Sequence, residues 1–183
     1  MSDIDEITKE VLDFWFLETP PEKRFVTDAA FDAEIHLRFY WVYEDIQTGG
    51  HQRYMSSASS ILAAIIVLDQ FSRNMFRDDP QAFAEDRRAI ALAFYAADQG
   101  LDQEIAENRR AFLYMPFMHS ENAADHERAV MLFTGLGNDM FLEFELKHKA
   151  IIDEFGRYPH RNAVLGREST AEELAHVAEH GGF

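Results

Sequence analysis

The sequence predicts an all-α protein, and two observations support that prediction. Apolar residues recur at helical spacing along almost the whole chain. No two segments of alternating apolar and polar residues flank a hairpin turn, so a sheet has no support. With 183 residues, 47% of them apolar, the chain is long enough to fill one core. We therefore expect a single all-helical domain over residues 1–183.

About eight helices are expected from the helical spacing of apolar residues. Ile7, Val11 and Trp15 mark the first helix, and residues 29–46 form the second, before a pair of glycines. The third covers residues 56–71, and its centre is apolar on all sides, which predicts a buried helix. The other helices are expected at residues 80–100, 105–118, 123–134 and 140–155, and from Ser169 or Thr170 onward.

The aromatic residues near the N-terminus are expected to lie in the core. They occur within the first two expected helices, where most large apolar side chains face inward. The residues are Phe14, Trp15, Phe16, Phe39 and Trp41.

The charge of the chain limits the classes of partner. The formal net charge is -16, and a surface this negative repels nucleic acid and anionic lipid. No cysteine is present, and the longest apolar run is far too short to span a bilayer. The acidic N-terminus does not resemble a secretory signal. We expect a soluble, cytoplasmic protein that binds neither nucleic acid nor membranes.

A turn-rich loop before the last helix reverses this charge locally. Residues 147–168 contain five cationic and three anionic residues. Arginine forks bind carboxylate or phosphate in a bidentate way, and histidine titrates near neutral pH. The loop could therefore clamp an anionic ligand, or its arginines could neutralise nearby acidic helices through Asp69 or Glu121. The loop residues in question are Arg157, His160, Arg161, Asn162 and Arg167.

A second polar cluster follows the buried third helix. Asp69 and Arg73 are four residues apart and can pair on one helix face. Together with Gln70 and Asn74 they could line a ligand pocket. Alternatively, Asn74 is a helix C-cap and Arg73 interacts with the helix dipole.

A third cluster lies near the end of the helix expected at residues 105–118. His119, Glu121 and His126 are residue types that bind metals, but their spacing matches no metal signature. Ser120 could simply cap the next helix. We predict no metal site and no cofactor, since no glycine-rich phosphate loop is present either.

Four segments of the chain together resemble a known bacterial family, domain of unknown function 924. The resemblance extends over essentially the whole chain. It implies an array of helical hairpins with a tetratricopeptide-like α-α superhelix, and it implies no catalytic residues. The segments are Val-Leu-Asp-Phe-Trp-Phe at 11–16, Leu-Asp-Gln-Phe-Ser-Arg-Asn at 68–74, Phe-Leu-Tyr-Met-Pro-Phe-Met-His-Ser-Glu at 112–121, and residues 148–170, which include Phe-Gly-Arg-Tyr-Pro-His-Arg-Asn.

The sequence specifies no reaction, so three interpretations stay open. The first is a binding module for a peptide or small anionic ligand, with the polar residues of the 68–74 and 157–167 segments as contacts. The second is a hydrolase-type enzyme, with His119 or His160 as general base, Glu121 or Asp69 orienting it, and arginines stabilising negative charge. The third is a structural network that fixes the C-terminal segment.

Overall fold

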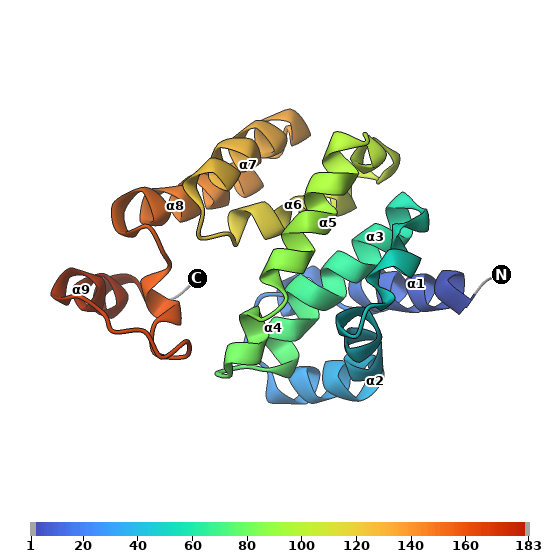
Figure 1. The fold of residues 1–183 in the computed structure, drawn as a ribbon, viewed down its shortest axis with the longest axis horizontal. Coiled ribbons are helices and arrows are strands. Elements are labelled where there is room, and N and C mark those ends of the chain that lie inside the picture. The colour runs from blue at the N-terminus through green and yellow to red at the C-terminus, as the bar shows by residue number, and fades with distance from the viewer. Residues whose placement is uncertain (1–2, 182–183) are drawn as a thin grey trace. The chain divides into compact units, whose positions relative to one another are not determined.

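The computed structural model describes residues 3–181, and this range is helical, with no β-strand (Figure 1). The predicted all-α fold is confirmed. The nine α-helices of this range are α1 Asp3–Asp13, α2 Ala29–Gln47, α3 Ala58–Ile65, α4 Ser72–Met75, α5 Asp86–Asp98, α6 Glu107–Met118, α7 Ala123–Leu136, α8 Asp139–Phe155 and α9 Ala171–His180.

The chain divides into two compact units. Unit 1 comprises residues 1–77 and 81–116, and unit 2 comprises residues 78–80 and 117–183. The expectations of a single domain and of a tetratricopeptide-like superhelix concern the whole chain, and they stay predictions.

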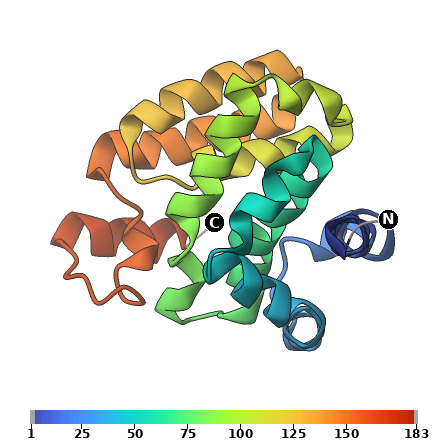
Figure 2. The ribbon, with the colours of Figure 1, turned by 45° about the vertical axis from the view of Figure 1, so that its right-hand side comes forward.

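The core of unit 1 is built around α3. The side chain of Ser57 begins this helix in a capping box with Ser60. The helical run then continues through a π-helical segment, Ile66–Phe71, into α4. The residues from Ile61 to Leu68 are at most 1% exposed, as the apolar sequence predicts. Helices α1 and α5 both pack against α3 (Figures 1 and 2).

The fifth helix begins later than predicted. Residues Pro80–Phe83 form a 3-10 turn, and α5 starts only at Asp86. The carbonyl oxygen of Ala82 accepts a hydrogen bond of 3.1 Å from the hydroxyl group of Ser72. In a continuous α-helix, the carbonyl oxygen of Ala82 would instead accept a hydrogen bond from the backbone N–H four residues later.

The prediction of an aromatic core holds for three of the five residues. Phe14, Trp15 and Phe39 are at most 2% exposed. Phe16 is only half-buried, and Trp41 is 48% exposed, so the prediction was wrong for these two. Trp41 follows Phe39 by two positions, which places it about 200° around the helix, away from the buried stripe.

In unit 2, α7 and α8 lie side by side as an antiparallel hairpin (Figures 1 and 2). Gly137, at a φ of 70°, ends α7, and the side chain of Asn138 caps α8. The start of α7 is capped by Asn122, so the possibility that Ser120 caps this helix was wrong. The predicted capping box of α9 forms between Thr170 and Glu173.

Candidate functional site in the C-terminal unit

The loop between α8 and α9 is fixed by an ion pair between Arg157 and Glu173. The guanidinium group of Arg157 donates hydrogen bonds of 2.6 and 2.8 Å to the two carboxylate oxygens of Glu173. Glu173 is 3% exposed and also accepts from the backbone N–H of Thr170, at 2.8 Å. These hydrogen bonds, with Arg157 first, lower the pKa of Glu173 to about 2. The carboxylate that completes the helix cap therefore also fixes the loop.

A second ion pair joins Glu121 to Arg167, which is 46 residues away in the sequence. Arg167 donates two hydrogen bonds, of 2.6 and 2.9 Å, to the carboxylate of Glu121. The backbone N–H of Tyr158 donates a third, of 2.8 Å. Burial alone would raise the pKa of Glu121, but Arg167 and Tyr158 together hold it below its ordinary value. Two of the segments that carry the family resemblance thus meet in unit 2.

Tyr158 lies at the centre of a ring of histidines. It is fully buried, and its hydroxyl group donates to the backbone carbonyl of Met118. The centroid of its ring lies 5.8 Å from the ring centroid of His148 and 5.5 Å from that of His160. The guanidinium carbon of Arg161, a residue 6% exposed, lies 4.5 Å from the Tyr158 centroid. The loop thus places two of its predicted site residues, His160 and Arg161, around one buried ring.

His148 is held in its neutral form. It is 7% exposed, and burial, with His119 as the next cause, lowers its pKa to about 3. Its Nδ1 lies 2.7 Å from the backbone carbonyl of Phe144, so Nδ1 carries the proton. The ring of His119 is half-buried, with its centroid 6.2 Å from that of His148.

A buried pair of His126 and Glu145 lies beside these rings. Both side chains are fully buried, and Nδ1 of His126 is 2.8 Å from a carboxyl oxygen of Glu145. Nε2 of His126 donates to the backbone carbonyl of Ser120, at 2.9 Å. Burial raises the pKa of Glu145 despite the hydrogen bond from His126.

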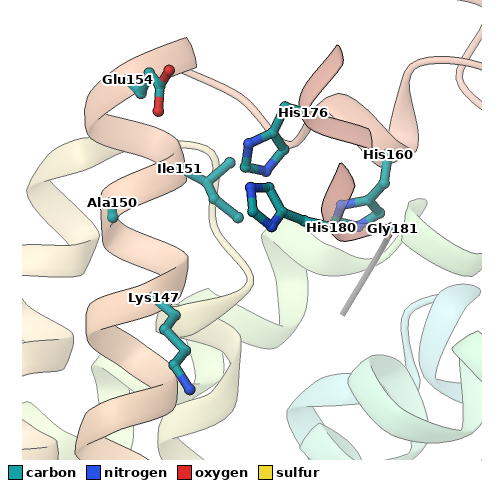
Figure 3. Close-up of a pocket in the computed structure, with 8 residues that line it drawn as sticks. All are labelled: Lys147, Ala150, Ile151, Glu154, His160, His176, His180 and Gly181. Carbon is teal, nitrogen blue, oxygen red and sulfur yellow. The ribbon is translucent and has the colours of Figure 1, made fainter. Parts of the chain in front are cut away.

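A cavity of about 310 Å³ lies between α8 and α9 (Figure 3). Its floor is Ile151, and the rings of His176 and His180 point toward it from α9, with their centroids 4.8 Å apart. The complete lining is Lys147, Ala150, Ile151, Glu154, His160, His176, His180 and Gly181. Lys147 and Glu154 are its two formally charged residues, of opposite sign.

A neighbouring cavity of about 420 Å³ is acidic. Its lining includes Glu154, Glu172, Glu173 and Arg157. Because Arg157 is paired with Glu173, the remaining charge of this cavity is negative. An anion is therefore better accommodated in the cavity lined by histidines.

The predicted site residues at positions 69–74 lie in unit 1, where they form a network of their own. Arg73 donates to the backbone carbonyl of Asp69 and pairs with the carboxylates of Asp69, at 3.4 Å, and Asp86, at 3.1 Å. The expected pairing of Asp69 with Arg73 is confirmed. Asn74 is not a C-cap, because it lies within α4 and its amide donates to Asp32 at 2.7 Å.

Sequence analysis missed several residues of the site in unit 2. His176 and His180 are four apart on a helix, a spacing visible in the sequence that could have marked the cavity. Glu145 and His148 carried no comparable local signal. Within residues 3–181, no group of three or more histidine, aspartate or glutamate side chains is placed to hold a metal ion.

The fold and the site define an all-helical protein whose C-terminal loop is fixed by two arginine–carboxylate pairs beside a cavity lined by histidines. The chain belongs to the bacterial family of proteins of unknown function DUF924, whose model matches residues 11–181. This result confirms the family resemblance seen in the sequence.

The chain is also similar to a protein of unknown function from Agrobacterium tumefaciens with a solved structure. The two are 37% identical with a TM-score of 0.91, and the match covers 97% of this chain and 99% of the other. No curated protein matches the chain significantly. In the described range, no helix is both long enough and apolar enough to cross a membrane.

Proposed function

We propose that this chain is a binding module for a small anionic ligand, which occupies the cavity between α8 and α9. The observation that supports this proposal is the set of donors in one cavity, namely three imidazole rings and the ammonium group of Lys147. A cavity of about 310 Å³ is within the range of small-molecule sites. An extended peptide would need a longer groove than these few residues provide.

Lys147 is the cation in this cavity that can turn toward a ligand. Its ammonium group lies 2.7 Å from Glu143, but both side chains are more than half exposed. Exposed pairs of this kind contribute little, so an anion in the cavity can compete for the ammonium group. The arginines of the loop are held more tightly, since Arg157 and Arg167 each bind a carboxylate through two hydrogen bonds.

The hydrolase alternative has weaker support. It requires Glu121 or Asp69 to orient a histidine base, yet both carboxylate oxygens of Glu121 accept hydrogen bonds from Arg167 or Tyr158. Asp69 lies in unit 1, where it pairs with Arg73. These contacts suit a structural role for both carboxylates.

The test is a calorimetric titration with acetate, benzoate, citrate and inorganic phosphate, with tetramethylammonium as a cationic control. Lys147→Gln should weaken binding of the anions by about fivefold, which corresponds to one lost charged contact. Lys149→Gln is the matched control, because Lys149 lies on the same helix and pairs with Asp153 but does not line the cavity.

His176→Ala should also weaken binding. The proposal would be abandoned if none of the anions binds, or if the two lysine variants weaken binding equally.

A further inference from the structure

Unit 1 has a surface cluster of arginine and phenylalanine side chains that the proposed function does not use. We call it the arginine–aromatic patch, and its members are Phe16, Arg24, Phe25, Arg109 and Phe112. The rings of Phe25 and Phe112 are parallel within 4°, with centroids 6.2 Å apart, and Phe16 meets Phe112 edge-on at 5.3 Å. The guanidinium carbons of Arg24 and Arg109 lie 5.5 and 4.8 Å from the Phe16 centroid. The patch is thus one contiguous stack of cationic and aromatic groups.

Part of this stack is open to solvent, although Phe112 is only 3% exposed and the other members except Phe25 are half-buried. Phe25 is 64% exposed, and Leu17 and Val26, which adjoin Phe16 and Phe25 in the sequence, are 68% and 49% exposed. Large apolar side chains grouped in this way are typical of surfaces that bind a partner. Aromatic and arginine side chains are also the types enriched at the energetic centre of protein interfaces.

The two arginines of the patch differ from most others in unit 1. Arg38, Arg53 and Arg77 each form an ion pair with a carboxylate. Among the described residues, no carboxylate lies within ion-pair distance of Arg24 or Arg109.

The contacts of Arg24 are with neutral acceptors. It donates to the backbone carbonyls of Trp15 and Thr19, at 3.0 and 3.1 Å, and Glu22 acts on it only by longer-range attraction. In a chain of net charge -16, two adjacent arginines with no carboxylate partner among the described residues form a local excess of positive charge.

We propose that the arginine–aromatic patch docks an acidic segment of another protein. In this arrangement, a hydrophobic side chain of the partner packs on Phe25, and its carboxylates bind the guanidinium groups of Arg24 and Arg109. Charge complementarity selects this occupant, because a guanidinium fork pairs most strongly with a carboxylate. A nucleic acid would be repelled by the overall charge. A two-fold contact between copies would place these arginines against each other.

The test uses a fluorescein-labelled peptide of about a dozen residues in which glutamates alternate with leucine and phenylalanine. Two further peptides are compared with it, one with lysine in place of glutamate and one with alanine in place of the apolar residues. Fluorescence anisotropy should give the tightest binding for the acidic apolar peptide, weakening as salt rises from about 0.05 to about 0.5 M.

The variants separate a local site from a general effect of charge. Arg109→Glu reverses one charge of the patch, in the first turn of α6, where an acidic residue is well tolerated. It should weaken binding by about tenfold. Arg87→Glu is the matched control, since Arg87 is an exposed arginine of α5 outside the patch. Phe25→Ala should weaken binding as well, whereas Leu37→Ala, at a position 83% exposed, should not.

Three outcomes would overturn the proposal. The lysine peptide could bind as tightly as the acidic peptide. Arg109→Glu and Arg87→Glu could weaken binding equally, which would indicate only long-range attraction. Light scattering could show a dimer that Arg109→Glu dissociates, which would assign the patch to a second copy of the chain. Melting temperatures of all variants verify that each remains folded.

Discussion

Replacement of Glu121 by alanine is expected to destabilise unit 2 strongly, because one carboxylate satisfies three donors. Two of the donors belong to Arg167, and the third is the backbone N–H of Tyr158. Tyr158 is fully buried, so its N–H would be left without an acceptor. A stranded buried donor costs about 1–3 kcal/mol. The lost half-buried pair with Arg167 adds about 1 kcal/mol.

The expected loss is therefore about 2–4 kcal/mol, or a fall of about 4–16 °C in melting temperature for a chain of this size. Glu121→Gln keeps an acceptor for the Tyr158 N–H and removes only the charge, so it should lose about 1 kcal/mol. Glu127→Ala is the matched control, because Glu127 is 70% exposed and pairs with Lys149 at 3.0 Å. It should change the stability by less than about 1 kcal/mol.

The assay is urea denaturation followed by circular dichroism, supported by thermal melting. A double-mutant cycle with Arg167→Ala should give a coupling energy of about 0.5–3 kcal/mol for the pair. If Glu121→Ala and Glu127→Ala melted at the same temperature, the network around Tyr158 would not stabilise the loop, and the reasoning above would be refuted.

Because the pKa of Glu173 falls from 4.5 to about 2 on folding, its stabilising contribution is complete above pH 4.5 and is lost toward pH 2. Urea titrations in that window should show a steeper loss for wild type than for Glu173→Gln. His148 takes up a proton near pH 6.5 in the unfolded chain but only near pH 3 in the folded chain. The free energy of unfolding should therefore decrease as the pH is lowered from 6.5 to 3, by up to about 1.4 kcal/mol per pH unit. His148→Gln should remove that slope, and an unchanged slope would contradict the assignment. Thr170→Ala should lower stability by about 1 kcal/mol and speed hydrogen exchange in α9, and unaltered exchange there would contradict the capping role.

Local sequence patterns predicted the helices well, because helix boundaries depend on neighbouring residues. The start of α9 was visible in the Thr170–Glu173 spacing, and the Asp69–Arg73 pair in a spacing of four. Glu173 also pairs with Arg157, sixteen residues earlier. This pair forms because the loop folds back, and no periodic pattern in the sequence predicts such a fold.

Contacts between distant segments account for what the sequence did not predict. The expected start of α5 at Pro80 was wrong, since Pro80–Phe83 form a 3-10 turn whose Ala82 carbonyl group faces the hydroxyl group of Ser72. The amide of Asn74 binds Asp32, 42 residues earlier, so a residue typical of caps serves in a tertiary contact instead. The cavity of unit 2 is lined by residues of α8, α9 and the loop between them. A sequence pattern describes each of these segments separately and does not show that they meet.

The ribosome synthesises the chain from the N-terminus, so Arg157 is made before its partner Glu173. This order affects when the C-terminal loop can fold. All residues of unit 1 have been synthesised by Pro116, so its core can begin to form while the chain is still growing. Arg157, in contrast, emerges sixteen residues before the carboxylate that neutralises it. The two hydrogen bonds that fix the loop to the start of α9 can therefore form only after Glu173 has been synthesised.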